Sequence, residues 1–142
     1  MTTKIPIEVI SAENENFHII IKGKINNKDA FLMIDTGASR SVFDLSLFST
    51  KANDNRLAYQ DNTSAVNMIT DEIPSSKGII EELQLHDLKI YNFEATLIDL
   101  KHINDFYRNN LGKSINGLIG NDLLIQYNAV IDYSNMVLIL SC

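Results

Sequence analysis

Short apolar stretches alternate with clusters of polar, turn-forming residues along most of the chain, a pattern typical of β-hairpins. The first clear hairpin joins Phe17–Ile21 to Ala30–Ile34 through the turn cluster Asn26–Asp29. Because Phe31–Ile34 is apolar without interruption, we expect this strand to be buried on both of its faces.

The same pattern predicts further strands. They are expected at Ser41–Asp44, in two stretches within Thr63–Ile80, at Ile79–Leu85, at Leu88–Phe93, at Glu94–Leu100 as a third strand, and in a closing hairpin of Ala129–Asp132 with Met136–Leu140. Repeated hairpins with almost no helix predict an all-β domain.

Helix is expected only in short segments. A helical turn is predicted at Leu45–Phe48, a short helix around His102–Arg108 and another at Asp122–Gln126. Asn121 is a good N-cap for the last of these, because an asparagine side chain can accept a hydrogen bond from the first turn.

Composition narrows the function classes. We expect the 142 residues to form one domain, residues 1–142, with 45% hydrophobic and 21% charged residues, as in a soluble globular protein. A net charge of −6 argues against nucleic acid as a partner.

The longest apolar runs are about five residues, whereas a membrane helix needs roughly 20, so no membrane partner is expected. Met1–Ser11 has no signal-peptide pattern and Cys142 is the single cysteine, so we expect a cytoplasmic location.

The strongest chemical signal is Asp35-Thr36-Gly37-Ala38-Ser39, directly after the buried strand. An ionised carboxylate in such a position is costly unless it is paired or hydrogen-bonded. Gly37 allows backbone N–H groups to approach that carboxylate closely. Since an ordinary core would not place an aspartate there, Asp35 is the first candidate for a catalytic residue.

A second signal lies about 80 residues later, where Ile115–Leu124 carries Gly117 and Gly120 around two apolar residues. Together the two segments resemble those of retropepsin-like aspartic proteases, with Asp35–Ser39 matching the catalytic loop in its Asp-Thr-Gly-Ala form. The resemblance spans roughly Phe17–Leu140 and implies a closed, barrel-like acid-protease fold. It places the two glycines in a loop beside the catalytic strand, where close backbone packing leaves no room for a side chain.

The activity implied by this resemblance is hydrolysis of peptide bonds in a peptide or protein substrate. Two carboxylates share one proton and activate a water, and no metal or cofactor is required. The chain contains one Asp-Thr-Gly, so the resemblance implies a homodimer in which each copy supplies Asp35. Thr36 is the candidate for a hydrogen bond across the dimer. Ala38 lacks the hydroxyl that some members carry there, which implies a milder pH optimum than pepsin's.

Asp122 and Asp132 are the other carboxylates considered for the dyad. Asp122 falls in the first turn of a predicted helix, where it complements the helix dipole, and Asp132 opens a turn. Neither is followed by Thr-Gly, so both are interpreted as structural.

In this family a hairpin called the flap closes over the substrate. The resemblance places the flap within Thr63–Ile80, with Ile69, Thr70, Asp71 and Glu72 as substrate-binding residues at its tip. Family members usually have glycines at this tip, and Ile69–Glu72 has none. A solvent-exposed hairpin with no role in substrate binding is the alternative interpretation.

The sequence gives little support for a metal site or for a cysteine nucleophile. His18, His86 and His102 lack metal-ligand spacing, and no base is identifiable beside Cys142. The competing hypothesis is a non-catalytic module of the same fold that dimerises and binds an extended peptide by strand addition. The intact motif at Asp35 favours the enzyme, whereas the glycine-free flap favours the module.

Overall fold

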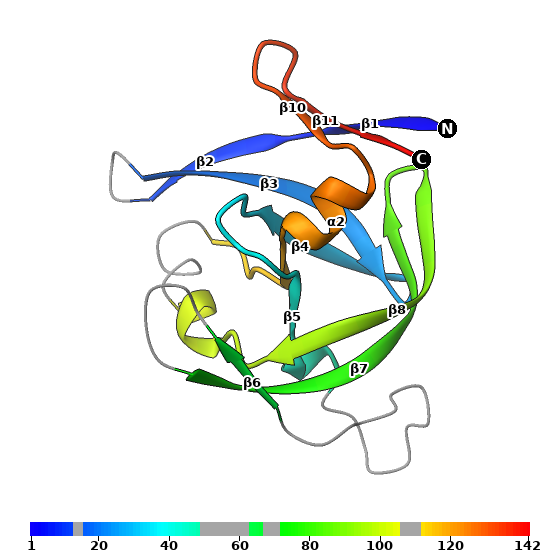
Figure 1. Ribbon diagram of the computed structural model, residues 1–142. Helices are drawn as coiled ribbons and strands as arrows, with labels where there is room; N and C mark the ends of the chain where they lie inside the picture. Colours follow the sequence, from blue (N-terminus) through cyan, green and yellow to red (C-terminus); the bar gives the residue numbers. More distant parts are fainter. Residues whose placement is uncertain (13–15, 49–62, 67–71, 106–111) are drawn as a thin grey trace.

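The computed structural model describes residues 1–12, 16–48, 63–66, 72–105 and 112–142 (Figure 1). Strands account for most of these residues. They are β1 (Thr2–Pro6), β2 (Glu8–Ala12), β3 (Asn16–Ile25), β4 (Lys28–Ile34), β5 (Val42–Asp44), β6 (Thr63–Val66), β7 (Glu72–Leu85), β8 (Leu88–Ile98), β9 (Gly117–Ile119), β10 (Val130–Asp132) and β11 (Val137–Ser141).

The helical segments are short: η1 (Leu45–Phe48), residues 101–105 and α2 (Asn121–Gln126). The predicted helical turn at Leu45–Phe48 is confirmed. The helix predicted around His102–Arg108 is confirmed as far as residue 105, and residues 106–108 lie outside the described ranges. None of the described helices is long and apolar enough to span a membrane.

Eight strands form one sheet in the order β2-β3-β4-β9-β5-β8-β7-β6. β3 also pairs with β7, through Lys24 opposite Gln84 and Ile25 opposite Leu83. This extra pairing closes the strands between β3 and β7 into a ring, which surrounds the centre of the molecule in Figure 1. The predicted all-β, barrel-like fold is therefore confirmed.

A smaller sheet of three strands, in the order β1-β11-β10, joins the two ends of the chain. The Met1 amino group donates to the Cys142 carbonyl at 2.9 Å, and the Cys142 N–H donates to the Met1 carbonyl at 2.9 Å. β1 and β2 were not predicted. The sequence does carry a signal for β1, because buried Thr3, Ile5 and Ile7 alternate with exposed neighbours.

The hairpin turn before β4 is shorter than the predicted Asn26–Asp29. Only Asn26 and Asn27 form the turn, with φ of 48° and 67°. Lys28 already pairs with Ile25. Two consecutive residues with positive φ are what a two-residue hairpin loop requires, and asparagine tolerates this conformation.

The prediction of a separate third strand at Glu94–Leu100 is wrong. β8 runs without a break from Leu88 to Ile98 and pairs with β7 along its length. Asn92 interrupts the regular backbone with a φ of 52°. The register is nevertheless the same on both sides of it, so the strand continues through this residue.

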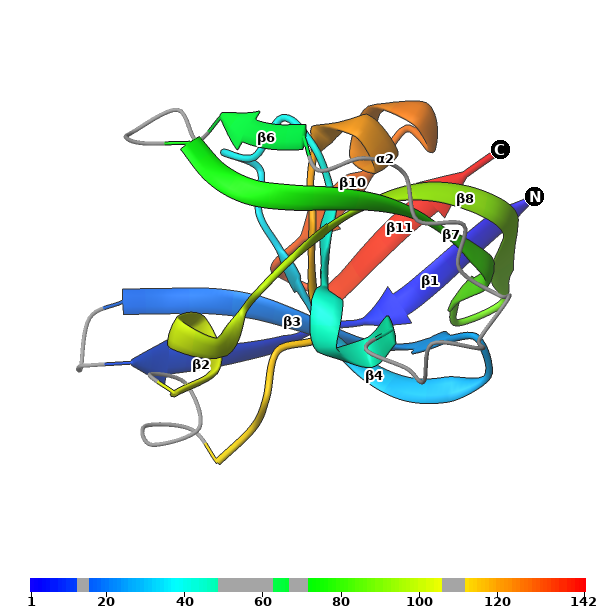
Figure 2. The same cartoon turned by 90° about the horizontal axis from the view of Figure 1, so that it is seen from below.

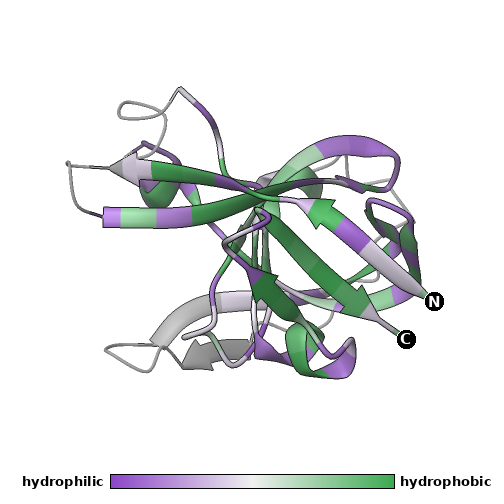
Figure 3. Cartoon of the chain, turned by 90° about the horizontal axis from the view of Figure 1, so that it is seen from above, coloured by the Kyte–Doolittle hydropathy of each residue, from purple (hydrophilic) through white to green (hydrophobic). Residues whose placement is uncertain are grey.

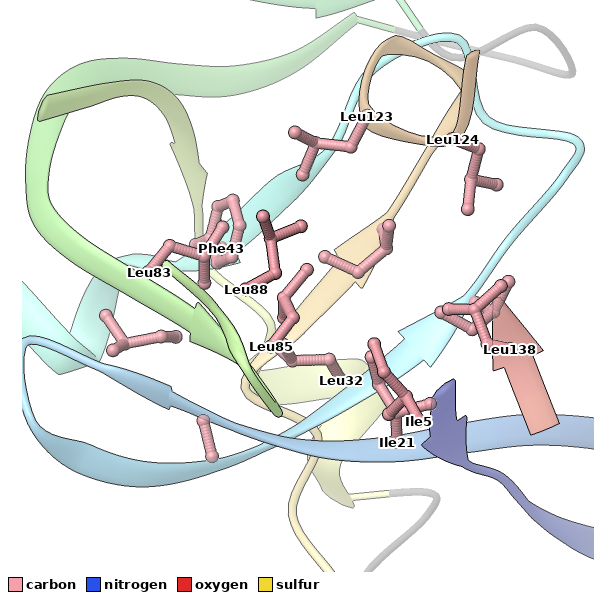
Figure 4. Packing of buried hydrophobic residues seen from close by; sticks show 14 of the residues in the cluster. Ile5, Ile21, Leu32, Phe43, Leu83, Leu85, Leu88, Leu123, Leu124 and Leu138 are labelled. Carbon is pink, nitrogen blue, oxygen red and sulfur yellow. The ribbon is translucent and has the colours of Figure 1, made fainter. Parts of the chain in front are cut away.

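β4 is buried on both faces, as its apolar sequence predicts. Leu32 and Ile34 belong to the main core cluster, part of which Figure 4 shows. Met33 points the other way, into a second cluster with Ile20 and Ile115. In Figure 3, hydrophobic residues lie mainly in the central strands, and hydrophilic residues lie mainly in the turns. Because side chains pack against both faces of β4, the end of this strand is held in a fixed position.

The structure predicts that β1 is an integral part of the core. Ile5 is 1% exposed and belongs to the main core cluster. Ile5→Ala should lower the free energy of unfolding by about 2–5 kcal/mol, as for other buried large side chains. Urea unfolding followed by circular dichroism measures the change. Phe17→Ala, at a side chain 66% exposed, is the control and should change stability by about 0.5 kcal/mol or less. An equally small effect of Ile5→Ala would contradict the assignment of β1 to the core.

Candidate active site

Asp35 is the first residue after β4, and its backbone is held at the end of β9. Its N–H donates to the Ile119 carbonyl at 2.9 Å, and its side chain is half-buried. The Gly37 N–H donates to Asp35 Oδ1 at 3.0 Å. The other carboxylate oxygen, Oδ2, receives no hydrogen bond from the described residues. Among the described residues, one oxygen is thus fixed by the loop and the second is left without a hydrogen bond.

The loop that follows Asp35 is a tight turn. The Ala38 N–H donates to the Asp35 carbonyl at 3.1 Å. A Cβ at Gly37 would lie 3.3 Å from Asp35 Oδ1, so a side chain there would crowd the carboxylate, and glycine avoids this. Thr36 and Gly37 are exposed, whereas Ala38 is half-buried.

Gly117 and Gly120 have no room for side chains, as the resemblance implied, but placing both in a loop is wrong, because Gly117 is the first residue of β9, a strand that was not predicted. A Cβ at Gly117 would lie 2.8 Å from Phe43 Cδ1 and 3.0 Å from Leu32 Cδ2. A Cβ at Gly120 would lie 2.7 Å from the backbone carbon of Arg40 and 2.8 Å from its carbonyl oxygen. Gly117 therefore lets β9 pack between β4 and β5, and Gly120 lets the loop after Asp35 lie directly on the end of β9.

Ser41 and Asp122 form a hydrogen-bonded pair that holds the far end of this loop. Asp122 Oδ1 accepts from the Ser41 N–H at 2.9 Å and from Ser41 Oγ at 2.7 Å. Ser41 Oγ in turn accepts from the Gly120 N–H at 2.9 Å. Asp122 Oδ1 also accepts from the Leu123 N–H at 2.9 Å. Because Ser41 is buried, water competes little for these bonds. One carboxylate thus holds the loop and the first turn of α2 together.

Asn121 connects α2 to the start of the loop. Its Nδ2 donates to the Thr36 carbonyl at 2.8 Å, and its N–H donates to the Ala38 carbonyl at 2.8 Å. The prediction that Asn121 is the N-cap is wrong. Gly120 occupies the cap position without a side-chain cap bond, and Asn121 is the first residue of α2. The side chain acts as a donor to the loop and not as an acceptor for the helix.

Ser41 and Asn121 were not among the predicted site residues. Ser41 carries no local signal, because its partner Asp122 lies 81 positions away. Asn121 does follow a glycine at the start of a helix. That position indicates a helix start, but it does not reveal a contact with the Thr36 carbonyl, 85 positions away.

Asp132 lies at the end of β10, where the turn to β11 begins. Its Oδ1 accepts from the Asn135 N–H at 3.0 Å, and its Oδ2 accepts from Asn135 Nδ2 at 2.8 Å. These bonds, the backbone one first, lower the pKa of Asp132. Asp122 and Asp132 both make hydrogen bonds within the fold, which agrees with their interpretation as structural residues. Across the described ranges, no three His, Cys, Asp or Glu side chains form a group that could hold a metal ion.

The hairpin predicted as the flap is formed by β6 and β7. Val66 lies opposite Glu72, and Thr63 lies opposite Ser75. Glu72 is the first residue of β7, whereas Ile69, Thr70 and Asp71 lie outside the described residues. Figure 2 shows β6, the loop after β4 and α2 along the same side of the molecule.

Comparison with known proteins places this arrangement in context. Residues 21–123 match the family model described as aspartyl protease. No curated protein matches the chain. The fold is similar to the crystal structure of a retropepsin-like aspartic protease from Rickettsia conorii, with a TM-score of 0.56, 21% identity and coverage of 99% of this chain and 91% of that one. It is also similar to the retroviral protease-like domain of Ddi1 from Leishmania major, with a TM-score of 0.55, 19% identity and coverage of 84% of both chains.

The bonds at Asp122 predict a measurable contribution to stability. Asp122→Ala leaves the buried N–H and hydroxyl of Ser41 without their acceptor, which should cost about 1–3 kcal/mol in urea unfolding. Asp122→Asn should cost less, because its amide oxygen can accept the same bonds. The control is Asp87→Ala, which removes an exposed carboxylate and should cost about 0.5 kcal/mol or less. If the two alanine variants lost the same amount, the pair would not be holding the loop.

Proposed function

The chain belongs to the aspartyl protease family, and on that premise we propose that it is an aspartic endopeptidase with Asp35 as its catalytic residue. The observation that best supports the proposal is the local environment of the Asp35 carboxylate. Asp35 is half-buried at the end of a strand packed on both faces, with Oδ1 held by the Gly37 N–H. The loop around it is bonded to α2 at both ends, through Thr36 and Ser41.

The chemistry requires two such carboxylates within hydrogen-bond reach of one water. Like charges at that separation cannot both ionise, so one group is a base while the other keeps a proton. The base takes a proton from the water as it attacks the peptide carbonyl. The acid donates to the oxygen on which negative charge develops. Neither step needs a metal or a cofactor.

The second carboxylate comes, in this proposal, from Asp35 of a second copy of the chain. The sequence contains one Asp-Thr-Gly. Asp122 and Asp132 are committed to hydrogen bonds within the subunit. Thr36 is exposed and its hydroxyl makes no bond to the described residues, so it is our candidate for the hydrogen bond across the dimer.

The proposed substrate is an extended peptide or protein segment covered by the β6–β7 hairpin. We assign Ile69, Thr70, Asp71 and Glu72 to the tip that covers it, by resemblance to the flap of the family. The exposed single cysteine, Cys142, suits the reducing environment of the cytoplasm, which is the proposed location.

Asp35→Asn is the direct test of the catalytic role. The amide keeps the shape of the side chain but cannot act as a base, so hydrolysis of an unstructured protein should fall by about 10²–10⁴-fold or more. Asp132→Asn is the matched control and should hydrolyse at the wild-type rate. Circular dichroism checks that both variants are folded. Wild-type turnover by Asp35→Asn would exclude the proposed mechanism. A wild-type protein that binds peptide without cleaving it would instead support the non-catalytic module.

If each chain supplies half of the active site, activity should depend on the protein concentration. Activity per mole of chain should fall when the protein is diluted below its dimer dissociation constant, because dissociation removes the paired site. Co-refolding wild type with excess Asp35→Asn should also inhibit, since mixed dimers carry one catalytic carboxylate. Thr36→Val should raise the concentration needed for half-maximal activity. Constant activity per mole at every dilution, with no inhibition after co-refolding, would show that one chain holds a complete site.

A further inference from the structure

Arg40 is an exposed cation on the same loop as Asp35, five positions further along the chain. Its guanidinium makes no hydrogen bond or ion pair with the described residues. It is also the one arginine in the part of the chain that the structure describes. Within those ranges, therefore, no contact in the subunit accounts for a positive charge at this position.

The backbone of Arg40 is held against the end of β9. A Cβ at Gly120 would lie 2.7 Å from the backbone carbon of Arg40, so the two segments are in close contact. The next residue, Ser41, is buried and bonded to Asp122 through its N–H and its hydroxyl. The side chain of Arg40 thus leaves the loop from a fixed point, and the fold sets where that point lies relative to Asp35.

The two carboxylates nearest to this loop do not neutralise Arg40. Asp122 Oδ1 already accepts three hydrogen bonds, two from Ser41 and one from the Leu123 N–H. Asp35 Oδ1 accepts from the Gly37 N–H. Neither carboxylate forms an ion pair with Arg40. The guanidinium therefore keeps its full donor capacity for a carboxylate of a bound molecule.

The protein as a whole repels acidic peptides. It has 18 acidic and 12 basic residues and a formal net charge of −6. Charge of one sign disfavours the approach of a molecule of the same sign, although salt screens this effect beyond about 10 Å. On net charge alone, the protein should prefer neutral or basic substrates. A preference for acidic ones would have to come from a cation held at the site.

The loop is compact enough for Arg40 to reach a peptide bound at Asp35. The Ala38 N–H donates to the Asp35 carbonyl at 3.1 Å, and two further residues span at most about 7 Å. Each residue of an extended peptide advances about 3.3 Å, so the three residues beside the cleaved bond lie within roughly 10 Å of it. Figure 2 shows the loop on the same side of the molecule as β6, part of the hairpin proposed to cover the substrate.

We propose that Arg40 determines specificity by pairing with an aspartate or glutamate of the substrate, within about three residues of the cleaved bond. Arginine suits this role because its planar guanidinium can donate two parallel hydrogen bonds to one carboxylate. Twofold symmetry repeats every residue, so the proposed dimer carries one Arg40 on each side of the cleaved bond. The substrate class is therefore an acidic peptide segment. The inference rests on the proposed function and adds a substrate preference to it.

Cleavage of a mixed peptide library, with the products identified by mass spectrometry, tests this preference. Wild type should cleave near Asp and Glu more often than their frequency in the library predicts. Arg40→Gln should lose this enrichment, and Arg40→Glu should replace it with an enrichment of Lys and Arg, because the charge is reversed. Lys28→Glu is the matched control. It makes the same change of charge at the exposed first residue of β4, at the opposite end of that strand from Asp35, and should keep the acidic preference.

Two peptides that differ only in Glu or Gln beside one cleaved bond give the size of the effect. Arg40→Gln should lower the ratio of their kcat/KM values by about threefold to tenfold. The change should appear mainly in KM, because the ion pair forms on binding and persists in the transition state. Added salt should reduce the wild-type ratio. A variant that is merely misfolded loses activity on both peptides alike and leaves the ratio unchanged.

The outcomes separate this role from the catalytic one. Cleavage by wild type without acidic enrichment, or with an enrichment that Arg40→Gln retains, overturns the role of Arg40 and leaves that of Asp35 standing. A dimer weakened by Arg40→Gln in sedimentation velocity, without any acidic preference, would show that Arg40 pairs with the second copy instead.

A wild type that cleaves nothing would exclude the enzyme, and binding then decides the role of Arg40. Fluorescence anisotropy compares fluorescein-labelled Glu and Gln forms of the same peptide. Tighter binding of the Glu form by wild type, lost in Arg40→Gln and kept in Lys28→Glu, supports an acidic preference in a non-catalytic module. Equal binding of the two forms, or no binding of either, overturns it.

Discussion

The hydrogen bonds between Ser41 and Asp122 hold together the parts of the chain that make the site. They join positions 81 residues apart and act at a buried serine, where water competes little. β4 fixes the loop where it begins, and this pair fixes it where it ends. Asp35 is therefore held in place before any partner or substrate binds. Such preorganisation suits the catalytic role proposed for Asp35, because electrostatic catalysis needs groups that do not reorient during the reaction.

Sheet topology explains why glycine is needed beside the site. β9 lies between β4 and β5, so the loop that connects β4 to β5 must cross over the end of β9. The crossing brings the backbone of Arg40 onto Gly120, and any side chain at residue 120 would collide with it. The same insertion brings Gly117 against Phe43 and Leu32. Both glycines thus follow from placing one strand between the two strands that flank the loop after Asp35.

Local patterns in the sequence predicted most of the strands and the position of Asp35, because both depend on neighbouring residues. An uninterrupted apolar run before an aspartate already indicates a buried strand that ends at a carboxylate. The contacts of Ser41 and Asn121 could not be predicted, since they depend on partners that only the folded topology brings close. β1 was missed although its alternation is visible. β1 is short and pairs with β11 at the opposite end of the chain, and nothing near it in the sequence indicates a hairpin.

The pairing of β1 with β11 has a consequence for how the protein folds. Thr2 and Ser141 face each other across 139 positions, so β1 is completed by a strand far away along the chain. Contacts between such distant positions form slowly, because the chain between them must first be ordered. Until β11 is in place, Ile5 lacks a pairing strand beside it, and the smaller sheet cannot close.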